Sequence, residues 1–284
     1  MDEIQKTLLA EVADLHGVPA GAYNIRSNGE SIDRKSTEHI EIVGKTDKSG
    51  IDIYIKLVYN DFHIGEDCDV TIIAGCGIHN SGDAASEHDG IHTFFVGKNA
   101  KLRYVEKHYG SGDGKGERIL NPQTIVHMEE GSYMEMEAVQ IKGVDSTVRQ
   151  TRADLAAGAT LVVKEKIMTH GVQHAETKFY VDLNGEDSST NVVSRSVAKE
   201  DSTQVFYSQI NGNNKCAGHT ECDAIIMDRA TVKAIPALEA NNLEASLIHE
   251  AAIGKIAGEQ LIKLMTLGLT EAEAEEQIVN GFLK

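Results

Sequence analysis

The period of the hydrophobic pattern changes near residue 40, and this change most constrains the fold. From Glu41 onward, short runs alternate apolar and polar residues with a period of two, as in IDIYIKLVY at 51–59 and TQVFYSQI at 203–210. Alternation of this kind is typical of half-buried β-strands. Gly, Asp, Asn and Ser punctuate the runs. The pattern therefore predicts many short strands, and no helix, between about residues 40 and 235.

A turn ending in Asp, Asn or Gly recurs along the chain before several of these runs. The turn residues are spaced by 32 positions at first and by 27 later: Asp67, Asn99, Gly131, Gly158 and Gly185, and the pair Asp201 and Asp228. A period near 27 predicts the coils of a β-solenoid with two or three strands each. An antiparallel barrel or sandwich, in which turns usually recur every 8–12 residues or so, is the alternative.

Both ends of the chain carry a helical pattern. Apolar residues three to four positions apart predict a short helix over 3–16, which Gly17 and Pro19 end. From His249 onward the apolar spacing again becomes helical, and Thr270 with Glu273 matches a capping box. We predict three parts with these bounds: an N-terminal helical segment at 1–25, a β-helix core at 26–238 and a C-terminal helical region at 239–284.

Charge and composition narrow the function classes. The formal net charge of −17 disfavours nucleic acid and anionic membranes as partners, because both are negatively charged. The N-terminal pattern is unlike a signal peptide, and no run approaches the ~20 apolar residues of a membrane span. Four cysteines in 284 residues are too few for a disulfide scaffold. We expect a cytoplasmic protein.

Common catalytic motifs are missing from the sequence. No GxxxxGK[ST] nucleotide loop is present, and the HEAAI run at 249–253 lacks the second His of a zinc protease motif. The chain is therefore not expected to be an enzyme in itself. We expect the C-terminal helical pair either to cap the end of the solenoid or to dock another protein.

Two groups of residues could bind metal, because Cys, His and carboxylates are ligands for iron, zinc and iron–sulfur clusters. The first group comprises Cys68, Cys76, His79, His88 and His92. The second comprises Cys216, His219, Cys222, Glu239, Glu244, His249 and Glu250. The alternative for each group is that the cysteines are core residues and the histidines are merely hydrogen-bonded.

The stretch KCAGHTECDAIIMD at 215–228 holds Cys216 and Cys222. On an extended strand their side chains would lie about 20 Å apart. Side chains alternate across a strand, so His219 would face the opposite side. The stretch could surround one metal only if the chain bends at Gly218.

The C-terminal part of the sequence resembles a known family. TECDAIIMD, followed by IPALEANNLEASLIHEAAIGKIAGEQL and by a helix ending in IVNGFL, is similar to the C-terminal core of the SufB/SufD family. These proteins are scaffold subunits of the SUF iron–sulfur cluster assembly machinery. The resemblance implies a right-handed parallel β-helix with a C-terminal helical region that docks an ABC-type ATPase, SufC. It also implies pairing with a second copy or with a SufD-like subunit.

The resemblance also assigns candidate residues. It implies that Cys222 is the residue of cluster assembly, and that His249, with Glu250 beside it, acts across the subunit interface. Cys216 and His219 are added on their ligand chemistry alone. The expected cargo is a transient iron–sulfur cluster, which further implies sulfur-donor and cluster-acceptor proteins as partners.

Two other classes of protein remain open from the residues alone. A mononuclear zinc or iron hydrolase would hold one tightly bound metal per monomer. A structural β-solenoid that binds other molecules usually presents aromatic platforms, whereas aromatic residues make up only 5% of this chain.

Overall fold

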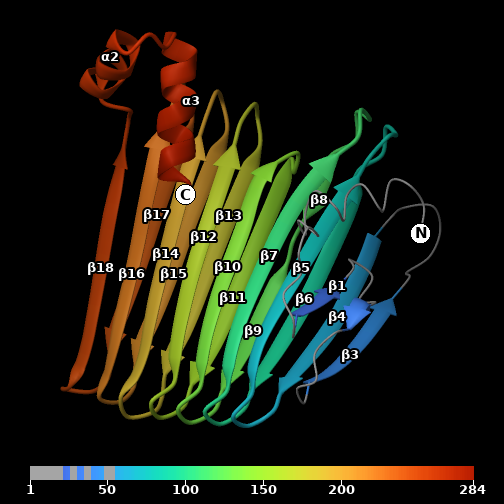
Figure 1. The fold of residues 1–284 in the computed structure, drawn as a ribbon, viewed down its shortest axis with the longest axis vertical. Coiled ribbons are helices and arrows are strands. Elements are labelled where there is room, and N and C mark those ends of the chain that lie inside the picture. The colour runs from blue at the N-terminus through green and yellow to red at the C-terminus, as the bar shows by residue number, and fades with distance from the viewer. Residues whose placement is uncertain (1–21, 26–30, 35–39, 48–54) are drawn as a thin grey trace.

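The computed structural model of the chain describes residues 22–25, 31–34, 40–47 and 55–284. The helix predicted over residues 3–16 lies outside these residues. The described chain forms two long β-sheets that face each other and are wound as one β-solenoid of about seven turns (Figure 1). The β-solenoid predicted from the repeat is confirmed, and the antiparallel barrel is wrong.

From residue 55 onward the chain alternates between the two sheets, except that the successive strands 118–120 and 123–128 both lie in the second sheet. The first sheet contains β1 (Ala22–Ile25), β2 (Ser31–Arg34), β5 (Asp69–His79), β7 (Lys101–Ser111), β10 (Tyr133–Lys142), β12 (Thr160–Thr169), β14 (Ser188–Ala198), β16 (Cys216–Ile226) and β18 (Ala245–Gly254). The second sheet contains β3 (Ile40–Asp47), β4 (Ile55–Ile64), β6 (Ser86–Val96), β8 (Arg118–Leu120), β9 (Gln123–Met128), β11 (Ser146–Leu155), β13 (His174–Leu183), β15 (Thr203–Gly212) and β17 (Thr231–Ala240).

Strands within each sheet pair in parallel, and the pairing repeats from coil to coil. β12 pairs with β14 and β14 with β16, with a continuous register over their whole lengths. Among the described strands, antiparallel pairing occurs only between β1 and β2 and between β3 and β4, at the N-terminal end. Each coil from β10 onward contains one strand of each sheet, so a residue lies directly beside the residue about 27–29 positions later.

The predicted turn residues explain how the coils stack. Asp67, Asn99 and Asp228 have positive φ, as do Gly131 and Gly158, and this conformation is typical of Asn, Asp and Gly in tight turns. Gly185 and Asp201 also lie in these turns, where the positive φ falls on the nearby Asp187 and Glu200. Gly185 is needed for a different reason: a Cβ there would lie 2.0 Å from the backbone nitrogen of Ala157 in the preceding coil.

The space between the sheets is filled by every second residue of each strand. The rings of Phe62 and Phe94 stack with centroids 4.6 Å apart, and Tyr104 of the facing sheet packs on Phe94. Aliphatic residues such as Leu161 and Val163 continue this core toward the C-terminus. The alternation read from the sequence therefore decides which side chains lie inside the solenoid.

The C-terminal helices begin later than the boundary at residue 238. That boundary falls inside β17, and residues 245–254 form β18, in which Ala245, Leu247 and His249 continue the inward period of two. Helix α2 spans Gly258–Thr266 and α3 spans Glu271–Phe282.

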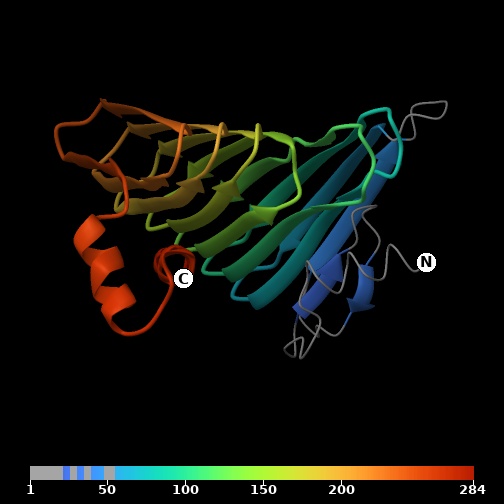
Figure 2. The ribbon, with the colours of Figure 1, turned by 90° about the horizontal axis from the view of Figure 1, so that it is seen from above.

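Helix α3 is anchored and α2 is not. Thr270 and Glu273 form the predicted capping box at the start of α3. Val279 and Leu283 then pack against Val197 and Met227, at the ends of the strands. Figure 2 shows both helices beside the C-terminal end of the solenoid. No helix among the described residues is long and apolar enough to cross a bilayer.

Truncation of a core residue should cost far more stability than truncation of an exposed one. Leu161 is fully buried, so Leu161→Ala should lower the free energy of unfolding by about 2–5 kcal/mol. Val172 is 88% exposed in the turn before β13, so Val172→Ala should change it by less than about 0.5 kcal/mol. Urea denaturation followed by circular dichroism measures both; equal losses would contradict the assignment of the core.

Candidate functional site

Strand β16 holds both C-terminal cysteines and sorts the candidate ligands onto two faces. Cys216 and Cys222 point into the solenoid and are buried, whereas His219 points outward. The strand is not bent at Gly218, since its register with β14 and β18 continues through this residue. A Cβ at Gly218 would lie 2.8 Å from Leu247 Cδ2, so this glycine leaves room for core side chains and does not mark a turn. Cys216 and Cys222 therefore do not surround a common metal.

His249 lies on the same inner face as Cys222. The register pairs Thr220 with His249 and Cys222 with Ala251, so His249 is the diagonal neighbour of Cys222 on the next strand. Strand spacing and rise place their Cα atoms about 8 Å apart. His249 Nδ1 is buried without a hydrogen-bond partner. Burial lowers the pKa of His249, which keeps the imidazole neutral and able to bind a metal.

The environment of Cys222 keeps it in the thiol form. Burial, followed by the negative charges of Glu165 and Asp223, raises the pKa of the Cys222 thiol to about 12. Glu165 and Ser194 precede Cys222 in one row of register partners across β12, β14 and β16. A thiol in such surroundings needs a bound cation or a structural opening to become a thiolate.

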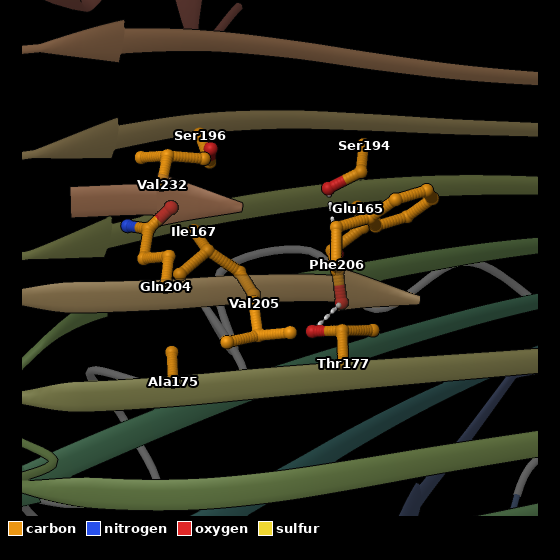
Figure 3. A pocket seen from close by; sticks show the side chains of 10 residues that line it. All are labelled: Glu165, Ile167, Ala175, Thr177, Ser194, Ser196, Gln204, Val205, Phe206 and Val232. Carbon is orange, nitrogen blue, oxygen red and sulfur yellow. Dashed lines mark hydrogen bonds between the residues drawn. The ribbon is translucent and has the colours of Figure 1, made fainter. Parts of the chain in front are cut away.

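A small cavity lies beside Glu165 in the same row. Figure 3 shows Glu165 pointing between Thr177 and Ser194, which donate hydrogen bonds of 3.0 and 2.7 Å to its two carboxylate oxygens. The cavity measures about 10 Å³, which is room for about one water molecule. The row of register partners that leads to Cys222 thus contains polar side chains inside the solenoid.

The outward-facing candidates gather into a separate cluster. His219, Glu221 and Glu250 bring their ligand atoms within 4.8 Å of one another, and His219 Nε2 lies 3.5 Å from Glu250 Oε2. His219 donates a hydrogen bond from Nδ1 to Asn191 Oδ1 (2.9 Å), which leaves Nε2 available as a ligand. Sequence reasoning missed Glu221, although its place two residues after His219 puts it on the same face.

The other candidates of the second group lie elsewhere. Glu239, at the end of β17, and Glu244, in the following turn, are exposed. Neither joins a cluster of metal-binding geometry within the part of the chain that the structure describes. Cys216 lies in the apolar core beside Gly212. The seven candidates therefore separate into an inner pair, an outer pair and three residues that contact neither.

The first group of candidates is also divided. Cys68 belongs to the apolar core, and His79 shares a hydrogen bond of 2.9 Å with Ser111. His88 is buried, but among the described residues it does not belong to a group of side chains that could hold a metal ion. Cys76 and His92 belong to a cluster of buried polar side chains inside the N-terminal half of the solenoid.

This interior cluster is centred on Glu106. Glu106 Oε1 lies 3.3 Å from His108 Nε2, 3.4 Å from His92 Nδ1 and 3.9 Å from Cys76 Sγ. Arg149 Nη2 approaches the other oxygen at 3.7 Å. Burial alone would raise the pKa of Glu106, but His108, His92 and Arg149 outweigh it and hold that pKa below its ordinary value.

Sequence reasoning missed three members of this cluster. Glu106, His108 and Arg149 occupy the inward phase of their strands, where an apolar residue is expected. A charged residue in the apolar phase of an alternating run was therefore the available signal. Their assembly from β7 and β11 depends on how the two sheets face each other, which the sequence does not reveal.

The fold and these residues define a β-solenoid protein in which a thiol and an imidazole face the same side of the last coils. The family described as "SUF system FeS cluster assembly, SufBD core domain" matches residues 59–282. The chain therefore belongs to the SufBD family, as the C-terminal motifs indicated.

Named relatives agree with this assignment. An iron–sulfur cluster assembly SufBD family protein of Archaeoglobus fulgidus is 30% identical over 284 residues, which are 100% of this chain and 72% of the relative. A SufBD family protein of Methanocaldococcus jannaschii is 30% identical over 77% of this chain and 68% of its own length. The iron–sulfur cluster assembly protein SufB of Bacillus subtilis is 37% identical over 102 residues, 34% of this chain and 22% of SufB.

The Cys222 thiol should resist alkylation in the folded protein. A pKa of about 12 lowers the thiolate fraction at pH 8 on the order of a thousandfold relative to a free cysteine, and burial slows the reaction further. Iodoacetamide labelling followed by peptide mass spectrometry should show slow modification of Cys222 in buffer and rapid modification in guanidinium. Rapid labelling of Cys222 in the folded chain would contradict this description of its environment.

Proposed function

We propose that this chain is a scaffold subunit on which a labile iron–sulfur cluster is assembled and from which it is released. The observation that carries the proposal is the place of Cys222 and His249, which face the same side of the last coils in a chain of the SufBD family. In this proposal Cys222 provides a thiolate and His249 an imidazole. Glu250 faces outward beside His219, and in this proposal it would join the ligand set only after the last coil opens.

Mixed ligation suits a scaffold that must give up its cluster. Iron–sulfur clusters held by four cysteines are retained as cofactors. Cys216 lies six residues from Cys222 on one unbent strand, so this chain does not bring two thiolates to one cluster. One thiolate per chain, completed by imidazole and carboxylate groups, would bind the cluster more weakly and allow transfer to an acceptor protein.

The buried thiol requires an opening of the last coil. Cys222 is 1% exposed, and β18 lies beside it at the end of the first sheet. Displacement of β17 and β18 would uncover Cys222 and His249 without disturbing earlier coils. Iron bound at the opened site would stabilise the thiolate form of Cys222.

A second subunit would complete the site at this end. β17 and β18 are the last strands of their sheets, and no described strand pairs with their outer edges. Unpaired edges favour pairing with another chain. Leu238, Ile248 and Ile253 add exposed apolar side chains there. We propose that the partner is a second copy of this chain or a SufD-like subunit.

Helix α2 would dock the ATPase that drives the opening. None of its residues is buried, and Ile262 and Leu267, in the helix and just after it, are 63% and 75% exposed. The chain has no nucleotide loop of its own. We propose a SufC-like ABC ATPase as the partner at α2, with sulfur-donor and cluster-acceptor proteins meeting the site in the cytoplasm.

Removal of the Cys222 thiol should abolish cluster assembly. Anaerobic reconstitution of wild type with iron and sulfide should give visible absorption that Cys222→Ala loses. Cys68→Ala is the matched control, since Cys68 is also a buried core cysteine and should retain the absorption. Equal cluster content in the Cys222→Ala and wild-type chains, at equal folded content, would refute the assignment.

Charge on α2 should weaken binding of the ATPase without unfolding the chain. Ile262→Asp and Leu267→Asp place a carboxylate on exposed apolar positions, so each should reduce affinity at least about tenfold in calorimetry with a SufC-like ATPase. Val172→Asp, at an exposed apolar position remote in sequence, is the control and should bind normally. Unchanged affinity of both α2 variants would exclude α2 as the docking site.

A further inference from the structure

The interior cluster around Glu106 has the composition and geometry of a metal site. Cys76 and His108 are register partners on β5 and β7, and Glu106 lies two residues before His108 on the same inner face. One ligand atom of each residue lies within 4.8 Å of the other two. All three residues are at least 97% buried.

Several polar atoms of this cluster lack the partners that burial normally demands. Both ring nitrogens of His108, Glu106 Oε2 and Arg149 Nη1 are buried without a hydrogen bond. Gln140, the register partner of His108 on β10, has an unpaired Oε1 as well. Buried polar groups are almost always hydrogen-bonded, so a concentration of exceptions indicates a bound water or ion.

We propose that Cys76, Glu106 and His108 form a second metal site, inside the solenoid, that binds one divalent transition-metal ion of the Zn²⁺ or Fe²⁺ class. A thiolate, an imidazole and a carboxylate suit these ions, whereas Mg²⁺ and Ca²⁺ prefer oxygen ligands alone. The thiolate and the carboxylate together carry two negative charges, which match a divalent cation. The proposal goes beyond cluster assembly at Cys222.

Arg149 fits this site as a positioning residue. Its guanidinium lies between two carboxylates, 3.7 Å from Glu106 Oε2 and 3.9 Å from Glu165 Oε1. Arg149 therefore approaches Oε2 of Glu106. The other oxygen, Oε1, remains directed toward Cys76 and His108. Groups that orient a ligand in this way usually strengthen metal binding.

The site is separate from the proposed cluster site. Cys76 lies on β5 and Cys222 on β16, five strand spacings away in the first sheet, or about 24 Å. An ion at Cys76 therefore does not share ligands with Cys222. Because the site is closed, the ion should enter faster during refolding than after the chain has folded.

Cobalt binding tests the proposal in a chain that cannot assemble the cluster. In full-length Cys222→Ala, refolded anaerobically with Co²⁺, we expect one bound ion and a thiolate-to-cobalt charge-transfer band in the near ultraviolet. The further substitution Cys76→Ser should abolish the band, whereas Cys68→Ser should leave it unchanged. Glu106→Gln, which keeps the size of the side chain, should raise the dissociation constant at least about tenfold.

The outcomes are distinct from those that test cluster assembly. If folded Cys222→Ala binds no Co²⁺, or if the band persists in folded Cys76→Ser, the interior cluster holds only water and the proposal is wrong. If Cys76→Ser does not fold, the test rests on Glu106→Gln. An unchanged Co²⁺ affinity in Glu106→Gln would then show that the proposed metal site is wrong. Loss of the iron–sulfur absorption in Cys222→Ala bears on the proposed function alone.

Discussion

The in-register stacking of parallel strands is the constraint on which the rest of this structure depends. Each inward position lies beside the same inward position of the coil before and the coil after. A side chain therefore meets partners about 27–29 residues away in sequence, and its face is decided by the parity of its position. This rule puts Cys222 and His249 inside and sends His219 and Glu250 outside, although the four residues lie within 35 positions of one another.

The same stacking makes charged residues tolerable inside a narrow core. Glu106 and Glu165 belong to one row of register partners and are separated there by Ala138. The small side chain leaves space, and Arg149 enters that space from the facing sheet to lie between the two carboxylates. Ionised groups in an apolar interior are costly unless they are paired. The small Ala138 between Glu106 and Glu165 thus provides the space in which Arg149 can pair with both acidic side chains.

Much of the architecture could be predicted from the sequence, and the limits have physical causes. Strand alternation placed His219 opposite Cys216 and Cys222, and the repeat period identified most of the turn residues. The sequence did not reveal which residue of β18 lies beside Cys222, because register depends on the lengths of two intervening turns. It also did not reveal the cluster of Cys76, Glu106 and Arg149, since Cys76 and Glu106 meet through the register of β5 and β7 and Arg149 joins them only from the facing sheet. The predicted start of the C-terminal helical region, after residue 238, lies before the last strand. The run LIHEAAI has apolar residues at spacings that fit both a strand and a helix, and the structure shows that it belongs to β18.

The unpaired end of the solenoid gives the chain a gradient of stability. In a stack of repeats each coil is held mainly by its nearest neighbours, so an internal coil has two stabilising interfaces and a terminal coil has one. The coil of β17 and β18 is therefore expected to open more readily than the internal coils around Phe94 and Leu161. Cys222 lies one strand inside this boundary. Fraying of that coil would therefore uncover the Cys222 thiol at a small fraction of the free energy that global unfolding requires.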